Sequence, residues 1–280
     1  MAYATNYTLE EQIVARLARV FDPKDRILAE SVTHCGRAAL ALAKRLYAPE
    51  LALVVLCHRT SLILKRDRLG LLPRSIPDED IEGEIPERDI FYLINHGMWH
   101  IFMGPAQVDI YGNANISLIG DKAKPTVAFP GSIGLPDNTT NQKRVVWLVN
   151  NHSKRAFVPK VDFISGVGHI ELRRKGNIKY GAPVLVVSNL GCFDFDPASG
   201  RMRVQSLHHG VGLEQVVANT GFELVVPAKV PPTEPPTTEE VQLLREEIDP
   251  LGVCRLDFAQ GDEAIRISAE VKKREAALAR

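Results

Sequence analysis

The spacing of hydrophobic positions changes along the chain, and each spacing predicts a different element. Thr8 precedes an apolar pattern of helical period, and Glu11 stands three residues later, which is the capping-box arrangement of a helix start. The pattern then predicts a strand at 26–32, a helix at 36–47 and a strand at 51–57. Because these elements follow one another through short connections, they predict a parallel βαβ unit with a right-handed crossover.

The middle of the chain predicts further strands and one surface segment. Segment 69–87 is rich in proline and acidic residues, so we expect a surface excursion there, followed by a helical or mixed segment at 89–102. The patterns at 145–149, 156–164 and 183–188 predict strands, and 166–181 predicts a hairpin. Together these elements predict an α/β fold with an open, mostly parallel sheet.

The last quarter of the chain has a different composition. Five prolines predict a stiff extended arm that wraps the surface or a partner: Pro227, Pro231, Pro232, Pro235 and Pro236. Thr237 and Glu240 then predict a capped short helix, and 262–280 predicts a charged helix. We therefore divide the chain into an α/β domain at 1–225, an arm with a short helix at 226–255 and a charged tail at 256–280.

Composition and charge exclude several partners. The 280 residues can bury a substantial core, and 34 Lys and Arg balance 34 Asp and Glu, so no net field favours nucleic acid or an anionic membrane. The N-terminus lacks a basic region followed by an apolar core, and the apolar run 51–57 is too short to span a bilayer. The four cysteines stand singly, which suits a reducing compartment. We expect a cytoplasmic protein with no nucleic-acid or membrane partner.

Segment 107–140 holds the clearest binding signal. Two apolar runs end in small or amide residues, which include Asn113, Asn115, Gly131, Ser132 and Gly134. Glycine lets backbone N–H groups approach a ligand, and asparagine and serine offer neutral hydrogen bonds. This pattern predicts a site for a polar, carbonyl-bearing small molecule. A Gly-Asn turn and a tight bend between strands are the structural alternatives.

Histidine and cysteine occur together where two predicted strands end. His34 adjoins Cys35, and Cys57 adjoins His58 and Arg59. A metal site, a thiol nucleophile and purely structural strand ends all fit these residues, and we favour the structural interpretation and predict no metal.

Three other segments are interpreted as ordinary surface or loop structure. His152, in the polar segment 151–155, is predicted to lie in a solvated turn, and His208 in a surface loop. The charged run 65–68 is predicted to be a solvated face. Gly166 and Gly168 lack the third glycine and the following helix of a dinucleotide fingerprint, so no Rossmann cofactor site is expected.

Several motifs in fixed order resemble a known family. The chain contains, in order, QVDIYGNANIS, FPGSIGLPDNTTN, KRAFVPKVDFISGVG, VVSNLGCFDFD and LHHGVGLEQVVANTGFEL. This series is similar to the beta subunit of class I coenzyme A transferases of the glutaconate type. Within that family it looks closest to the beta chain of the transferase-like hydrolases that open the last ring of cholesterol in actinobacteria. The likeness covers about residues 10–250.

The resemblance implies an open α/β fold of the NagB/RpiA-like type and a separate alpha subunit, in an α2β2 heterotetramer with the active site between subunits. Ordinary beta chains carry a nucleophilic glutamate just after the strand predicted here at 51–57. This sequence has Leu56, Cys57, His58 and Arg59 there, and no carboxylate follows until Asp67. The departure argues against ordinary CoA transfer, because thiol or imidazole groups cannot form the same acyl anhydride.

The ring-opening branch similarly lacks the beta-chain glutamate, and its essential carboxylate comes from the alpha subunit. The resemblance therefore implies hydrolytic carbon–carbon cleavage of a cyclic keto acyl-CoA, as in steroid degradation, with CoA entering as part of the substrate and no other cofactor. From their places after predicted strands, we assign substrate binding to Asn113, Asn115, Gly131, Ser132, Gly134, His34, His58 and Arg59. A true CoA transferase subunit and a non-catalytic structural subunit stay open as alternatives.

Overall fold

The computed structural model describes residues 2–56, 60–71, 78–142, 144–178 and 180–278. The chain forms two compact units, one of Met1–Ile90 with Glu234–Arg280 (unit 1) and one of Phe91–Thr233 (unit 2). The C-terminal helices therefore belong to the same compact body as the N-terminal βαβ segment. The boundary at residue 90 falls inside helix α3 (Glu87–Asn95).

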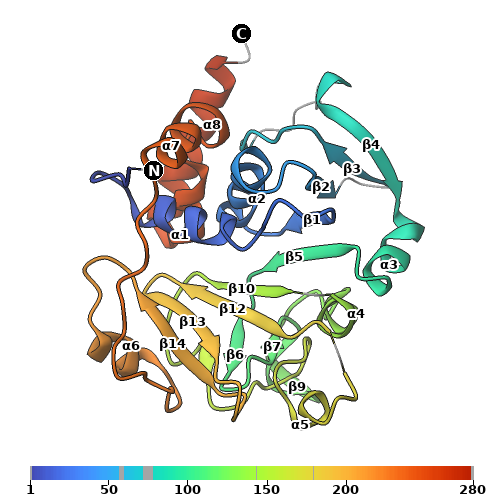
Figure 1. Ribbon diagram of the computed structural model, residues 1–280, viewed down its shortest axis with the longest axis vertical. Helices are drawn as coiled ribbons and strands as arrows, with labels where there is room; N and C mark the ends of the chain where they lie inside the picture. The colour runs from blue at the N-terminus through green and yellow to red at the C-terminus, as the bar shows by residue number, and fades with distance from the viewer. Residues whose placement is uncertain (1, 57–59, 72–77, 143, 179, 279–280) are drawn as a thin grey trace. The chain divides into compact units, whose positions relative to one another are not determined.

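Unit 1 combines a small sheet with helices from both ends of the chain (Figure 1). The capping box predicted at Thr8 is present, since its side chain accepts from the Glu11 amide and Glu11 bonds back to the Thr8 amide. The elements of unit 1 are α1 (Leu9–Ala18), β1 (Leu28–Ser31), α2 (His34–Leu46), β2 (Ala52–Leu56), β3 (Thr60–Leu64), η1 (Asp78–Asp80), β4 (Ile81–Pro86), α7 (Thr238–Leu243), η2 (Leu244–Ile248), η3 (Val253–Asp257) and α8 (Gly261–Leu278).

The predicted βαβ segment is confirmed, because β1 and β2 pair in parallel on either side of α2. Strands β3 and β4 then extend the sheet by antiparallel pairing. The surface excursion predicted at 69–87 is therefore wrong for Ile81–Pro86, which is a paired strand. Acidic residues alternate there with Ile81, Gly83 and Ile85, and this alternation is the pattern of a half-buried edge strand.

Unit 2 contains five strands that lie side by side in the order β14-β13-β12-β10-β5, and several short elements. Its elements are β5 (Trp99–Met103), β6 (Gln107–Asp109), β7 (Ala114–Asn115), β8 (Leu118–Asp121), β9 (Lys124–Ala128), α4 (Leu135–Asn141), β10 (Val145–Val149), β11 (Phe157–Val158), α5 (Glu171–Arg174), β12 (Pro183–Ser188), β13 (Gly191–Phe195), β14 (Met202–Leu207) and α6 (Leu213–Asn219). Strands β5, β10 and β12 pair in parallel, and β13 and β14 continue as antiparallel strands. The predicted strands 145–149 and 183–188 are confirmed, and the open α/β class is confirmed with them.

Two predictions for unit 2 are wrong. The strand predicted at 156–164 is paired only over Phe157–Val158, because Pro159 has no N–H to donate to a ladder. The hairpin predicted at 166–181 is instead a loop with the short helix α5. The Arg173 side chain holds this loop by donating to the carbonyls of Gly168 and Tyr180, so a side chain replaces strand pairing.

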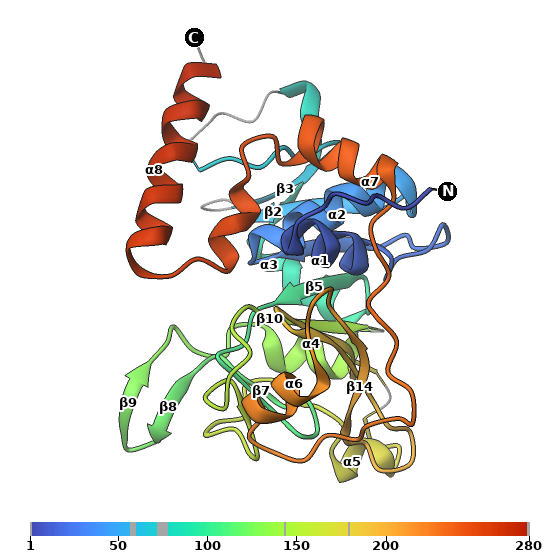
Figure 2. The ribbon, with the colours of Figure 1, turned by 90° about the vertical axis from the view of Figure 1, so that its left-hand side faces the viewer.

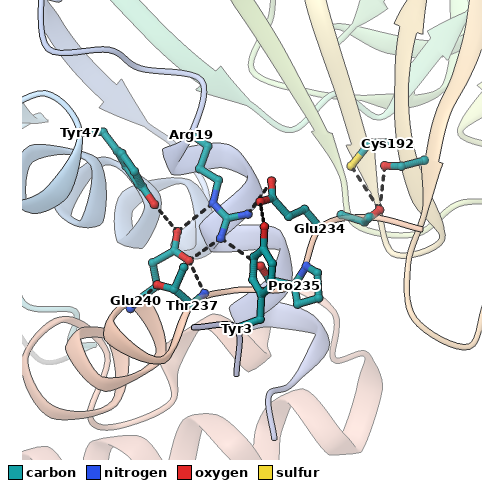
Figure 3. A network of polar contacts seen from close by, with 10 residues as sticks. Tyr3, Arg19, Tyr47, Cys192, Glu234, Pro235, Thr237 and Glu240 are labelled. Atoms are coloured by element: carbon teal, nitrogen blue, oxygen red, sulfur yellow. Dashed lines mark hydrogen bonds and ion pairs between the residues drawn. The ribbon is translucent and has the colours of Figure 1, made fainter. Parts of the chain in front are cut away.

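The proline-rich arm lies along each unit in turn. Within unit 2, the Thr233 amide donates to the Leu207 carbonyl at 2.6 Å, and Pro232 forms a parallel bridge with Leu207. Within unit 1, Arg19, which directly follows α1, donates to the carbonyl of Pro235 at 3.0 Å (Figure 3). The predicted helix after the arm is confirmed as α7, with the Thr237–Glu240 capping box in place.

A buried ion cluster anchors α7 to α1 and α2. The Glu240 side chain is fully buried and accepts from the Arg19 guanidinium at 3.0 Å and from the Tyr47 hydroxyl at 2.6 Å (Figure 3). Burial alone raises the pKa of Glu240, but the bonds from Arg19 and Tyr47 outweigh it and hold the pKa below its usual range. Every polar atom of the Glu240 carboxylate thus has a partner inside the protein.

The predicted charged helix near the C-terminus is confirmed as α8, which runs for 18 residues. Ile267 and Val271 are its buried contacts, while Ile265 is exposed. Among the described residues, no helix combines the length and the apolar character needed to cross a membrane.

Candidate functional site

The first asparagine of the binding segment is a structural residue of a tight turn. Asn113 is buried, and its side-chain amide donates to the Asp109 carboxylate at 2.8 Å while its carbonyl accepts from the Gly168 amide at 2.8 Å. Burial raises the pKa of Asp109, and its bonds from Asn113 and Tyr111 oppose that change. The Gly112 carbonyl of the same turn accepts from the indole of Trp147 at 3.0 Å. The turn is therefore fixed from several sides.

The second asparagine is also used inside the protein. Asn115 is fully buried, and its side chain donates to Gln107 Oε1 at 2.8 Å and to the Leu118 carbonyl at 2.6 Å. Its carbonyl oxygen accepts from the amides of Ser117 and Leu118. The side chains of both asparagines thus form their hydrogen bonds with the backbone and with neighbouring side chains. They stabilise the local structure of the segment.

The loop 130–134 has the opposite character, because its backbone donors are left open. Gly131 has φ +117, and a Cβ placed there would meet nothing within 4 Å. The amides of 131–134 have no acceptor within the described part of the chain. Helix α4 begins directly after, and the Ser132 and Gly134 carbonyls accept from Leu135 and Asn138. The loop is thus anchored through its carbonyls while its N–H groups remain available.

Ile133 is the unusual residue of this loop. Within the described ranges it is the only non-glycine residue with a positive φ, at 50°, and its side chain is 74% exposed. A β-branched residue in this conformation is strained, and such strain persists only where the surrounding structure holds it. The half-exposed rings of Phe91 and Phe129 lie on neighbouring segments, and Phe91 approaches within 3.5 Å of a Cβ built on Gly134. The open amides are therefore bordered by apolar side chains.

Three serine side chains join the loop to the rest of the segment. Ser132 Oγ lies 2.9 Å from Ser117 Oγ, and Ser117 Oγ lies 2.8 Å from Ser165 Oγ. Asn115 fixes the backbone of Ser117, so the predicted site residues Asn115 and Ser132 are connected through it. Nearby, the β8–β9 hairpin extends away from the other strands of unit 2, as Figure 2 shows.

His34 lies in unit 1, at the first position of α2. Its backbone amide donates to Asp257 at 3.2 Å, and the Cys35 amide donates to the same carboxylate at 2.7 Å. The half-buried imidazole lines a pocket of about 310 Å³ together with Glu30 and Arg37. Sequence reasoning missed Glu30, a buried carboxylate at the end of β1, although an acidic residue inside an apolar strand was a usable signal.

The remaining strand-end residues divide into two groups. Cys57, His58 and Arg59 lie outside the described residues, so their predicted roles stay predictions. Cys35 is buried against Cys254, and burial raises its pKa to about 12, which leaves the thiol protonated and unreactive. Among the residues that the structure describes, no group of three or more His, Cys, Asp or Glu side chains could hold a metal ion.

Two histidines interpreted as surface residues are buried instead. His152 is 4% exposed, stacks on Phe157 at 3.7 Å, and bonds to Ser188 and Thr220 through its two ring nitrogens. Burial lowers its pKa to about 3, so the ring is neutral. His208 is 2% exposed and bonds to the Ser188 carbonyl. No local pattern predicts this burial, because it depends on contacts with Ser188 and Thr220, which are distant along the chain.

The hydrogen-bond donors of loop 130–134 are of the kind that can bind a carbonyl or oxyanion. Unpaired backbone N–H groups and a serine hydroxyl are donors, and they stabilise negative charge that develops on oxygen. The surrounding apolar side chains reduce the local dielectric and strengthen such contacts. No described residue of this loop is a nucleophile with an adjacent base.

Comparison with known proteins identifies the family to which the chain belongs. The family model described as Coenzyme A transferase matches residues 78–219, which include the loop and the serine chain. The chain belongs to the coenzyme A transferase family, and the predicted resemblance and fold type are confirmed.

Particular relatives are subunits of two-subunit enzymes. The chain is 41% identical over 172 residues to the cholesterol ring-cleaving hydrolase IpdB subunit of Rhodococcus jostii (strain RHA1), which covers 61% of this chain and 67% of the relative. It is 34% identical over 244 residues to the IpdB subunit of Mycobacterium tuberculosis (strain ATCC 25618 / H37Rv), over 87% and 95% of the two chains. The crystal structure of Rhodococcus jostii RHA1 IpdAB matches with a TM-score of 0.81 and 32% identity, over 91% of this chain and 100% of the other.

Proposed function

We propose that this chain is the beta subunit of a two-subunit hydrolase that opens the ring of a cyclic keto acyl-CoA, as in the last ring of a steroid. The similarity to ring-cleaving hydrolase subunits over most of the chain carries this proposal. The absence of a carboxylate at 56–59 in the sequence supports it, since ordinary transfer needs a carboxylate to take up the acyl group.

In the proposed reaction, a carboxylate of the alpha subunit activates water, and the water oxygen adds to the ring ketone. The carbon–carbon bond between that carbon and the α-carbon of the thioester then breaks, which yields a carboxylate and a thioester enolate. The enolate oxygen carries the new negative charge until the α-carbon is protonated. The amides of 131–134 are suited to stabilise that oxygen, because they have no acceptor within the described chain.

The proposed assembly is an α2β2 heterotetramer in the cytoplasm. The solved relative contains two different subunits, which supports an alpha partner. Cys35, Cys192 and Cys254 are not joined in disulfides, which is in keeping with a reducing compartment. CoA enters this scheme as part of the substrate, and no metal or other cofactor is required by the chemistry.

The test is to co-express the chain with its alpha subunit and to incubate the complex with cyclic β-keto CoA thioesters in heavy-oxygen water. Mass spectrometry should find heavy oxygen in a new carboxylate while the thioester remains intact. Labelled free acid with release of CoA would instead show simple thioester hydrolysis and would contradict the proposal.

A second candidate, true CoA transfer, is favoured by one observation. Glu30 places a carboxylate in the pocket beside His34, and carboxylate is the group that forms an acyl anhydride. This candidate predicts acyl exchange between two CoA esters, trapping of the enzyme by hydroxylamine, and loss of both with Glu30→Gln. Exchange-free ring opening that survives Glu30→Gln would exclude it.

A further inference from the structure

The serine chain of unit 2 has hydrogen-bonding ends that differ in kind. At the buried end, Ser165 is 1% exposed and its Oγ accepts from the backbone amide of Ile116 at 2.9 Å. At the other end, Ser132 is half-buried and lies in the loop with open amides. An amide N–H can only donate, so Ser165 Oγ must accept from it. The direction of the hydrogen bond is therefore fixed at this end of the three linked serines.

The positions of the hydroxyl protons follow from this asymmetry. If Ser165 donates to Ser117 and Ser117 donates to Ser132, both Ser165 and Ser117 accept and donate, and only the half-buried Ser132 keeps a proton without a partner. In the reverse order, the proton of the 1% exposed Ser165 would have no acceptor. A buried unsatisfied donor is costly, whereas a half-buried one is not. The forward order is therefore the stable one.

We infer that Ser132 is a directed hydrogen-bond donor to an anionic oxygen derived from a thioester, and that Ser117 and Ser165 are positioning residues that set this direction. The inference deepens the proposed function and rests on it for the identity of the oxygen. Neighbouring hydroxyls in such a chain polarise one another, so the terminal O–H is a stronger donor than an isolated serine. Asn115 contributes indirectly, because it fixes the Ser117 backbone at 3.0 Å.

The test compares three serine variants in the assembled complex with a matched control. Ser132→Ala removes the donor, and Ser117→Ala cuts the chain behind it. Ser206→Ala is the control, because it also removes a hydroxyl-to-hydroxyl bond in unit 2, to Thr233 at 2.8 Å, away from the loop. Ser117→Thr retains a hydroxyl and should restore most of the function lost in Ser117→Ala.

Kinetics separate a donor from a structural residue. Ser132→Ala should lower kcat by about a hundredfold with KM within a factor of about two, as for loss of one oxyanion donor. Ser117→Ala should lower kcat by about tenfold. If Ser132→Ala instead raises KM and leaves kcat unchanged, Ser132 acts in ground-state binding, and the inferred donor role at the anionic oxygen is wrong.

A binding measurement keeps this inference distinct from the proposed function. S-carboxymethyl-CoA carries a carboxylate oxygen in place of the enolate oxygen, and its affinity is measured by calorimetry without turnover. Ser132→Ala should weaken its binding at least tenfold and leave the binding of CoA itself unchanged. Equal affinity in wild type and Ser132→Ala overturns the inference even where ring opening is observed. Weakened binding in a complex without ring opening would instead overturn only the proposed reaction.

Discussion

The loop at 131–134 in unit 2 and the ion cluster around Glu240 in unit 1 use polar groups in opposite ways. In the cluster, the Glu240 carboxylate is fully buried and is satisfied by Arg19, Tyr47 and the Thr237 amide. In the loop, a series of amides has no acceptor within the described residues. A closed network stabilises a fold, while an open one costs stability unless a ligand completes it. Substitutions in the loop should therefore change activity more than stability, whereas substitutions in the cluster should change stability.

The largest expected effect breaks the closed cluster. Glu240→Gln should lower the free energy of unfolding by about 3 kcal/mol, because the Arg19 guanidinium loses its buried charge partner and keeps only its ion pair with the exposed Glu234. Denaturant unfolding measures the change. The control Glu239→Gln alters an exposed neighbour on the same helix and should change stability by less than about 0.5 kcal/mol. Equal effects of the two variants would mean that the cluster contributes nothing specific.

Asn115→Ala should lower the unfolding free energy by about 2 kcal/mol, because it removes the four hydrogen bonds of a fully buried side chain and leaves Gln107 and the half-buried amides of Ser117 and Leu118 without these partners. It should also reduce turnover, because Ser117 then loses its fixed position. The control is Asn219→Ala, which removes one exposed bond to the Gln215 carbonyl. A catalytic defect with unchanged stability would show that Asn115 contacts the substrate directly.

Comparing Gly131→Ala with Gly210→Ala distinguishes the loop at 131–134 from an ordinary turn. Gly131 and Gly210 both have positive φ, at 117° and 79°, and a Cβ at either would meet nothing within 4 Å. Each alanine variant should cost about 1 kcal/mol of stability from backbone strain. Only Gly131→Ala should lower kcat, by about tenfold, because it displaces the amides. Equal kinetics of both variants would show that the loop does not touch the reacting oxygen.

The smallest expected effect concerns His152 and pH. The pKa of His152 in the folded state, about 3, lies below the ordinary value of about 6.5. At pH values between these two, the folded state therefore binds fewer protons than the unfolded state. Stability is then complete above pH 6.5 and falls by about 1 kcal/mol between pH 6.5 and pH 5.5. Chemical denaturation across this range should show that loss in wild type and not in His152→Gln. The same slope in both proteins would place the titration elsewhere.

The sequence predicts an element well where the residues that determine it are close along the chain. Strands 145–149 and 183–188 were predictable because uninterrupted Val and Leu runs between turn residues leave little alternative. Strand β4 was not, because its apolar positions alternate with acids in a proline-rich segment.

The same distinction applies to the candidate site. The glycines of the loop were visible in the sequence because their conformational freedom is local. The internal bonds of Asn113 and Asn115 and the three linked serines involve residues from three separate segments, 107–118, 132 and 165–168, which no local pattern connects. The burial of His152 and Glu30 is likewise a product of tertiary packing.

Amide hydrogen exchange of the assembled complex, measured by mass spectrometry with and without S-carboxymethyl-CoA, tests the open-loop account most directly. The account predicts that a peptide covering 130–135 exchanges readily in the free complex and becomes protected when the ligand binds, while the α7 peptide at 238–243 is protected in both states. An unchanged exchange rate at 130–135 with ligand bound would contradict the claim that these amides bind the substrate oxygen.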